Sequence, residues 1–317
     1  MPGSGATSSR DMKTATQPSE ALDADLGPDL SALIETVGVP VVEIAQVTTI
    51  RGNDGQRGTF RLTFADGRML KARRLRTASD VERVTRLTAL LEPEFFPPVL
   101  AHHGGGLLTD WIAGTAVRGG DWSAAHLRTC GRLQASMHRL SVSSELASLR
   151  RSPVNSGRQR LEAALIDLVA HGALALHDAG EVLELVDAGA PVRRRTAICH
   201  RDFCGDNIVV TAAGQVCVID NETIAVDSPE YDLARTWYRW PMTASEQRAF
   251  AEGYGRHAHL TDFATNFLHW ALSVLVESAA YRMRVGAATV GVPLKRLEDL
   301  LRTRGRNETF PRLLSGG

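Results

Sequence analysis

The sequence has very little lysine and no excess charge of either sign. Its 317 residues include three lysines, although lysine and arginine together number 36, so nearly every basic position is an arginine. Asp and Glu also total 36, which gives a formal net charge of zero. Proteins that bind nucleic acid through its phosphates normally carry a clear basic excess. We therefore expect no nucleic-acid partner.

Cysteines and long apolar runs are also scarce. The four cysteines match no zinc-ligand spacing, and Cys199 and Cys217 lie in apolar stretches, where they are expected to be small buried side chains. The most apolar stretch, residues 263–276, is too short to span a bilayer. Residues 1–25 include a start rich in Ser, Thr, Gly and Ala, without the apolar core of a signal peptide, and are expected to be a disordered tail. We expect a cytoplasmic protein with no membrane partner.

The most informative stretch, residues 200–222, combines three polar side chains with a predicted hairpin. Asp202 and Asn207 lie five residues apart in a polar loop. Two short apolar strands follow, separated by an Ala-Ala-Gly turn, and Asp220 comes directly after the second strand. Antiparallel pairing would bring Asn207 and Asp220 side by side, where their oxygens could hold Mg²⁺. Asp202 could exchange a proton with an incoming hydroxyl. The alternative is a polar hairpin whose Asp and Asn side chains cap turns.

This stretch resembles the catalytic segment of the aminoglycoside phosphotransferase and choline kinase family, which has a protein-kinase-like fold. The family's His-x-Asp-x-x-x-x-Asn loop matches residues 200–207, and its strand ending in Ile-Asp matches residues 219–220. Its Asp-Pro pair and Tyr-Asp-Leu-Ala run correspond to DSPEYDLA at 227–234. The resemblance implies an α+β, bilobal fold. We expect a nucleotide-binding N-lobe over 26–110, with a small antiparallel sheet and one helix, and a mostly helical C-lobe over 111–317 with the catalytic loop and acceptor site.

The resemblance also implies a role for each polar residue of the stretch. Asp202 would be the catalytic base, and Asn207 and Asp220 would complete the catalytic set as magnesium ligands. His200 would orient the loop rather than react, and Asp232 would be a buried brace for it.

Three other side chains of this stretch could contact the substrate. Arg201 departs from the small-molecule kinases of the group, which usually have a small residue there, whereas protein kinases have arginine. It leaves a peptide hydroxyl open as acceptor, although no Asp-Phe-Gly or Ala-Pro-Glu run is present. Asp206 and Glu222 add carboxylates, which could bind a cationic substrate, assist Mg²⁺ or simply be solvated.

The first half of the chain is expected to bind the nucleotide. Strands are predicted at residues 41–50, 59–64 and 68–75, and Lys71 is centred on the third. Kinase-like folds place on that strand the lysine that contacts the α- and β-phosphates. Because arginine fills nearly every other basic position, Lys71 is a stronger candidate than Arg73.

Weaker signals add further nucleotide contacts. Gly55 lies in a G-x-x-G-x-x-G turn that could cover phosphates or be a flexible hairpin loop. Glu82, on a predicted helix, could pair with Lys71, whereas Asp80 is better placed to interact with the helix dipole. The resemblance places adenine against backbone groups near the interlobe hinge, at Leu108, Asp110 and Trp111.

The second half of the chain has helical periodicity. Ser123 is predicted to cap a helix with one apolar face. Further helices are predicted over residues 161–169, 181–186, 244–253, 261–285 and 294–302.

These features predict an enzyme that uses ATP or GTP with Mg²⁺. It would move the γ-phosphate to a hydroxyl of a small molecule, either an antibiotic, in resistance, or a natural-product intermediate, in biosynthesis. One alternative is a kinase acting on a peptide serine or threonine in modified-peptide biosynthesis. Another is a catalytically inactive, kinase-like module that binds nucleotide.

Overall fold

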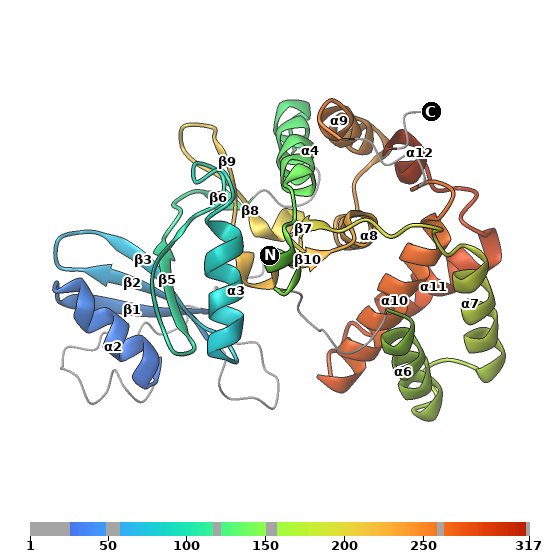
Figure 1. Cartoon of the computed structure of the whole chain (residues 1–317), viewed down its shortest axis with the longest axis horizontal. Helices are drawn as coiled ribbons and strands as arrows, with labels where there is room; N and C mark the ends of the chain where they lie inside the picture. The colour runs from blue at the N-terminus through green and yellow to red at the C-terminus, as the bar shows by residue number, and fades with distance from the viewer. Residues whose placement is uncertain (1–25, 49–57, 117–121, 150–156, 259–262, 315–317) are drawn as a thin grey trace, which may run out of the picture. The chain divides into compact units, whose positions relative to one another are not determined.

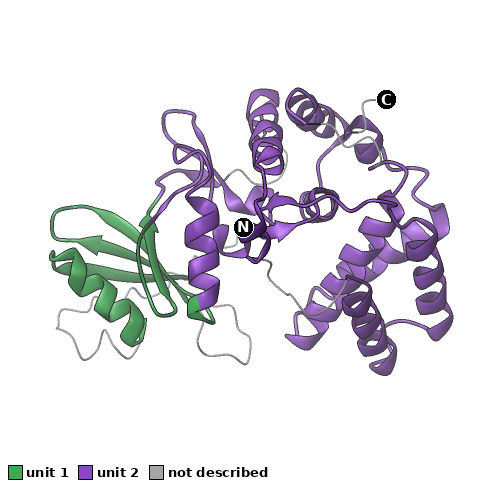
Figure 2. Cartoon of the chain, in the orientation of Figure 1, with its two compact units in different colours: residues 1–50, 56–78, 100–111 green, residues 51–55, 79–99, 112–317 purple. Residues whose placement is uncertain are grey.

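The computed structural model describes residues 26–48, 58–116, 122–149, 157–258 and 263–314 (Figure 1). These residues form two compact units (Figure 2). Unit 1 takes in the described residues up to 78 and residues 100–111, and unit 2 takes in residues 79–99 and the described residues from 112 onward. The expected tail, residues 1–25, lies outside the described residues. The expected division between residues 110 and 111 stays a prediction.

Unit 1 is built on a five-stranded sheet with the strand order β1-β2-β3-β5-β4. The strands are β1 (Val41–Thr48), β2 (Gly58–Phe64), β3 (Met69–Arg74), β4 (Val99–His103) and β5 (Gly106–Asp110). The β2–β3 hairpin turns at Gly67, which has a φ of 84°, a value that glycine adopts without a steric penalty. The three strands predicted in this region are confirmed to within a few residues. β4 begins at Val99, directly after Pro97 and Pro98, which have no N–H to donate to a strand.

Helix α2 (Pro28–Val37) belongs to unit 1 and was not predicted. Leu30 and Leu33 of this helix are buried against alternate residues of β2, which form one core cluster with them. Asp29 accepts a hydrogen bond from Gly105 N at 2.7 Å, which ties the helix to the β4–β5 turn. The sequence carried the signal, because Pro28 opens the first turn and apolar residues recur at helical spacing.

Unit 2 is mostly helical. Its helices are α3 (Ala78–Thr88), α4 (Ala124–Arg139), α5 (Ser144–Ala147), α6 (Gly157–Ala170), α7 (Leu176–Ala188), α8 (Pro229–Arg239), α9 (Ala244–Gly255), α10 (Phe267–Arg284), α11 (Gly291–Thr303) and α12 (Phe310–Leu314). Ser123 caps α4 as predicted, by accepting a hydrogen bond from His126 N. The helix predicted over 261–285 begins only at Phe267. In the described part of the chain, no helix combines the length and apolar character needed to cross a membrane.

Helices α4 and α9 cross with their backbones in contact. A Cβ atom at Gly131 would lie 2.1 Å from Phe250 O, and one at Gly253 would lie 2.0 Å from Arg128 O. Only glycine fits at either position, because real Cβ atoms do not approach other atoms so closely. This crossing places Gln134 and His138 of α4 in the interior of unit 2.

Short strands complete unit 2. They are β6 (Thr115–Ala116), β7 (Ala197–Cys199), β8 (Ile208–Val210), β9 (Val216–Val218) and β10 (Ala225–Asp227), with 3₁₀ turns η1 (Gly205–Asn207) and η2 (Asn221–Thr223). The predicted hairpin of β8 and β9 is confirmed, with Ile208 opposite Val218. The five-stranded antiparallel sheet and the mostly helical remainder confirm the expected α+β, kinase-like fold class.

Candidate active site

The catalytic loop follows β7 and ends where β8 begins. The amide nitrogen Nδ2 of Asn207 donates to Asp202 O at 2.8 Å and to Asp202 Oδ2 at 3.0 Å. Ile219 N donates to Asn207 O at 2.8 Å. Asn207 therefore lies beside the end of β9, where Asp220 follows. The structure thus places all three residues of the predicted catalytic set at one end of the hairpin.

Arg201 in the catalytic loop and Asp220 after β9 have an unusual backbone conformation. Asp220 has a φ of 60° and Arg201 a φ of 66°, and among the described non-glycine residues only Arg304 shares a positive φ. A left-handed Asp is tolerated better than a left-handed Arg, whose conformation costs about 1 kcal/mol or more. Left-handed residues of this kind cluster at functional sites, where the surrounding structure holds them in place.

The His200 side chain joins the catalytic loop to the turn after Asp220. Its Nδ1 accepts from Asp202 N at 3.3 Å, so its Nε2 carries the hydrogen and donates to Asn221 Oδ1 at 3.1 Å. Thr223 Oγ1 donates to His200 O at 2.7 Å. The imidazole therefore hydrogen-bonds to both segments, and its role in orienting the loop stays a prediction.

Asp232, on α8, is fully buried and accepts four hydrogen bonds. Oδ2 accepts from His200 N at 3.2 Å, from Gln134 Nε2 at 3.0 Å and from His138 Nε2 at 3.0 Å, and Oδ1 accepts from Arg201 N at 2.6 Å. Burial acts to raise the pKa of Asp232, but the bond from His138 and the other favourable contacts outweigh it and lower the pKa to about 2. The carboxylate thus stays ionised and fixes two successive backbone amides of the loop.

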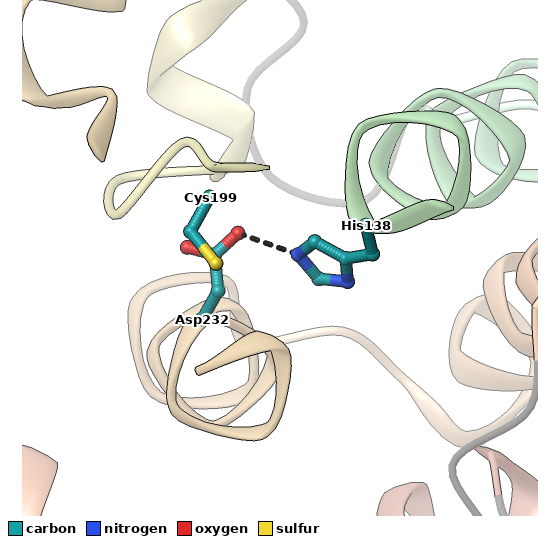
Figure 3. Close-up of side chains that lie close together, drawn as sticks. All are labelled: His138, Cys199 and Asp232. Carbon is teal, nitrogen blue, oxygen red and sulfur yellow. Dashed lines mark hydrogen bonds and ion pairs between the residues drawn. The ribbon is translucent and has the colours of Figure 1, made fainter. Parts of the chain in front are cut away.

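His138, Cys199 and Asp232 approach one another closely enough to suggest a metal site (Figure 3). Their chemistry argues against one. His138 Nε2 is already hydrogen-bonded to Asp232 Oδ2 at 3.0 Å, and burial, with the charge of Asp232 adding to it, raises the pKa of the Cys199 thiol well above its usual value. His138 Nδ1 is already paired with the Tyr254 hydroxyl at 2.9 Å. The ligand atoms of His138 are therefore used within the protein, and the role of Asp232 as a support of the catalytic loop stays a prediction.

Sequence reasoning missed two arginines that contact Asp202. On α8, Arg235 Nη2 lies 3.3 Å and Arg239 Nε 3.2 Å from the same oxygen, Asp202 Oδ1. Burial acts to raise the pKa of Asp202, but the two guanidiniums outweigh it and hold the pKa below its ordinary value. The available signal was their four-residue spacing, which places both on one face of the helix.

The possible substrate contacts have different surroundings. The Arg201 guanidinium pairs with Asp227 and lies 5.3 Å from the ring centroid of Tyr231. The Asp206 side chain is exposed and lies 4.0 Å from Arg239 Nη2. Glu222 O accepts from Arg83 Nη2 at 3.3 Å. Contact of Arg201, Asp206 or Glu222 with a substrate stays a prediction.

The expected nucleotide contacts on the sheet belong to unit 1. Lys71 is half-buried on β3, opposite Thr109 of β5. Its competitor Arg73 is buried and donates to Thr59 Oγ1, so that guanidinium is used within the sheet. Leu108 is buried in the core cluster. The remaining two residues expected to contact the nucleotide are Asp110, the last residue of β5, and Trp111, which follows it.

Two further predictions about the nucleotide site stay open. Gly55 lies outside the described residues. Glu82, on α3, has an exposed side chain 3.6 Å from Arg86 Nη1. Lys71 belongs to unit 1 and Glu82 to unit 2, and their pairing stays a prediction.

The assembled motifs can be compared with known proteins. A model described as the phosphotransferase enzyme family matches residues 47–268, well over half of the chain. The chain belongs to this family. The match takes in the catalytic loop, the hairpin and the α8 segment. The chain is therefore a phosphotransferase.

Solved structures of other phosphotransferases share the fold. A macrolide 2′-phosphotransferase of type I is 15% identical, with a TM-score of 0.62 over 90% of this chain and 99% of that one. Choline kinase from Streptococcus pneumoniae is 12% identical, with a TM-score of 0.61 over 86% and 99%. A spectinomycin phosphotransferase, solved with ADP and spectinomycin, is 15% identical, with a TM-score of 0.58 over 90% and 97%. At these identities the likeness establishes the fold and leaves the acceptor open. No curated protein sequence matches the chain.

Proposed function

We propose that this phosphotransferase transfers the γ-phosphoryl group of ATP to a hydroxyl of a small molecule, with Asp202 as the base. A bond forms between the acceptor oxygen and the γ-phosphorus, and the bond from that phosphorus to the β–γ bridging oxygen breaks. The hydroxyl proton passes to Asp202 and then to solvent, and ADP leaves. The observation that carries the proposal is the ionised Asp202 carboxylate, which Asn207 Nδ2 holds at 3.0 Å.

The loop residues divide the work between orientation and proton transfer. His200 and Asp232 fix the backbone on either side of Arg201, so that the Asp202 carboxylate keeps one position. A base held in place avoids the entropic cost of orientation during the reaction. Because its pKa is low, Asp202 acts mainly by accepting a hydrogen bond from the hydroxyl and aligning it, and takes the proton late in the transfer.

The nucleotide is proposed to be ATP with Mg²⁺, and GTP is the alternative. The Asn207 amide nitrogen is used within the loop, so its oxygen would be the ligand, together with the Asp220 carboxylate. This oxygen-donor pair suits a hard cation that also binds phosphate oxygens. Bound Mg²⁺ would supply charge neutralisation at the β- and γ-phosphates. We propose Lys71 for the α- and β-phosphates, with Glu82, Gly55 and the Leu108–Trp111 segment completing the nucleotide site.

For the acceptor we propose an antibiotic-like or other natural-product alcohol. Related folds include proteins whose names give macrolide and choline as acceptors, which supports a small molecule. The hypothesis of a peptide acceptor depended on Arg201, but the guanidinium of Arg201 is paired with Asp227 and lies over the ring of Tyr231. No observed contact therefore favours a peptide over a small molecule.

The first test is Asp202→Asn, with Asp299→Asn as the control. Asp299 is an exposed carboxylate of α11 that pairs with Arg302. We expect Asp202→Asn to bind ATP and Mg²⁺ like the wild type but to lose about 10²–10⁴-fold in turnover of ATP. Titration calorimetry measures the first quantity, and release of labelled phosphate, with and without candidate acceptors, measures the second. Wild-type turnover in Asp202→Asn would remove Asp202 as the base, and nucleotide binding without any turnover in the wild type would favour an inactive module.

A further inference from the structure

Two guanidiniums of α8 lie beside Asp202, and two more, from α10 and α11, lie beside Tyr238 of the same helix α8. We infer that the acceptor carries an anionic group, a carboxylate or a phosphate, and that arginines of α8, α10 and α11 bind it. This inference rests on the proposed function, because it takes the hydroxyl facing Asp202 to be the one phosphorylated. The residues concerned are Arg235, Tyr238, Arg239, Arg282 and Arg296.

The first observation is the incomplete pairing of Arg235 and Arg239. Both guanidiniums approach one oxygen of Asp202, so two positive charges share one carboxylate. Arg235 Nε is buried and makes no hydrogen bond with any described residue, and Arg239 Nε, although 3.2 Å from Asp202 Oδ1, is not aligned for a hydrogen bond. The other contacts of Arg239 are weak ones, to Cys204 Sγ at 3.9 Å and to the exposed Asp206 at 4.0 Å. Both side chains retain some exposure to solvent, 22% and 29%, so a ligand can reach them.

The second observation is the buried hydroxyl of Tyr238, which has no hydrogen-bond partner among the described residues. Tyr238 is only 5% exposed. Leaving a buried hydroxyl unpaired costs free energy, so an orphaned one calls for an explanation. Burial raises the pKa of Tyr238, and the positive charges of the four arginines all act against that rise. An anion accepting from this hydroxyl would satisfy it.

Two arginines from other helices extend the cluster around Tyr238. The Arg282 guanidinium of α10 lies 5.7 Å from the centroid of the Tyr238 ring and donates to Thr289 O, and within the described ranges it has no carboxylate partner. Arg296 of α11 donates to Tyr238 O at 3.2 Å. Its guanidinium lies 3.7 Å from the centroid of the Trp237 ring, and burial lowers the pKa of Arg296 although Glu308 acts to raise it.

These contacts point to the sign of the ligand. Arginine presents a planar fork of donors that matches carboxylate and phosphate oxygens. A cationic acceptor such as an aminocyclitol or choline would meet uncompensated like charge beside Asp202. The arrangement therefore favours an acceptor with an anionic group near its reactive hydroxyl.

A matched set of sugars can test this inference. Glucose, glucosamine, glucuronate and glucose 6-phosphate share a ring and differ in one neutral, cationic, carboxylate or phosphate group. Binding is measured by ligand-observed NMR on the full chain saturated with ADP and Mg²⁺, so that the nucleotide site is filled, at constant ionic strength. We expect at least one of the two anions to bind about tenfold or more tightly than glucose and glucosamine, as charge-assisted hydrogen bonds allow. Whichever anion binds more tightly distinguishes a carboxylate site from a phosphate site.

Variants test which side chains cause the preference for the anionic sugars. Arg239→Gln and Arg282→Gln should each remove most of the preference for the anion, and Arg239→Lys should restore part of it. Tyr238→Phe should weaken anion binding several-fold without lowering the melting temperature, because the hydroxyl makes no hydrogen bond with any described residue. Arg302→Gln, which removes an exposed arginine of α11, should leave binding unchanged. Equal binding of all four sugars, or an anion preference that survives both glutamine variants, would overturn the inference.

The same preparations keep the two proposals separate. Turnover of ATP without any sugar, compared between wild type and Asp202→Asn, tests the proposed function alone. If that turnover depends on Asp202 and the anions bind no better than glucose, only the acceptor class is wrong. If the anions bind through Arg239 and no Asp202-dependent turnover occurs, only the phosphotransfer assignment to Asp202 is wrong.

Discussion

Asp232 and Asp202 are two carboxylates of unit 2 that are stabilised in different ways. Asp232 is fully buried, and its four donors are two backbone amides, a glutamine amide and an imidazole. Asp202 is 24% exposed and faces two guanidiniums. The donors of Asp232 belong mostly to buried residues, whereas Asp202 and its two guanidiniums are partly exposed to solvent. The comparison separates a carboxylate that holds the fold together from one that is available to a substrate.

The largest expected effect comes from removing the buried charge. Asp232→Asn replaces acceptor oxygen with an amide that faces donors, and it should lower the free energy of unfolding by on the order of 3 kcal/mol. Asp202→Asn should lower it by less than about 1 kcal/mol, because its pairs are partly exposed. Urea denaturation of both variants measures the two losses. Equal losses would mean that the two carboxylates do not differ in the way their contacts indicate.

Arg83 is the cationic counterpart of Asp232, a buried charge held mainly by neutral backbone groups. It lies on α3, is 6% exposed and donates to Ile224 O at 3.0 Å and to Glu222 O at 3.3 Å, in addition to its pair with Asp80. It thus ties α3 to the segment that follows Asp220.

Arg83→Gln should therefore destabilise unit 2 and loosen that segment. Two carbonyls would lose a charged donor, which should cost about 2 kcal/mol in the free energy of unfolding and lower kcat for ATP turnover. The matched control is Arg86→Gln, on the same helix, whose partners Glu82 and Glu145 are exposed. We expect a change below about 0.5 kcal/mol there. A similar loss in both variants would show that Arg83 has no special role.

The catalytic hairpin could be predicted from the sequence because the signals for it lie in one contiguous segment. β-Branched runs, an Ala-Ala-Gly turn and the His-x-Asp-x-x-x-x-Asn pattern are contiguous, and they predicted β8, β9 and the adjacency of Asn207 to the end of β9. Lysine scarcity selected Lys71, and the structure then placed Arg73, its competitor, in a bond to Thr59.

Contacts between distant segments were beyond sequence reasoning. Arg83 meets carbonyls more than a hundred residues away, and nothing in an arginine on an amphipathic helix predicts that partner. Arg235 and Arg239 follow the recognised Tyr-Asp-Leu-Ala run, but in a chain where most basic residues are arginine they did not stand out. Their significance depends on the position of α8 beside the catalytic loop, which tertiary packing decides.

The smallest effect is a pH dependence that should separate the two aspartates once more. The folded-state pKa of Asp232 is about 2, below its usual 3.8, so its contribution to stability is fully present above about pH 4 and is lost as pH falls toward 2. The total is about 2 kcal/mol, of which about 1 kcal/mol should be lost by pH 3. The Asp232→Asn variant has no carboxylate to protonate at this position. The difference in unfolding free energy between wild type and Asp232→Asn should therefore narrow by about 1 kcal/mol between pH 6 and pH 3. Other carboxylates titrate in both proteins and cancel in the difference. If the difference in unfolding free energy between the two proteins stayed constant from pH 6 to pH 3, Asp232 would not be ionised in the folded protein.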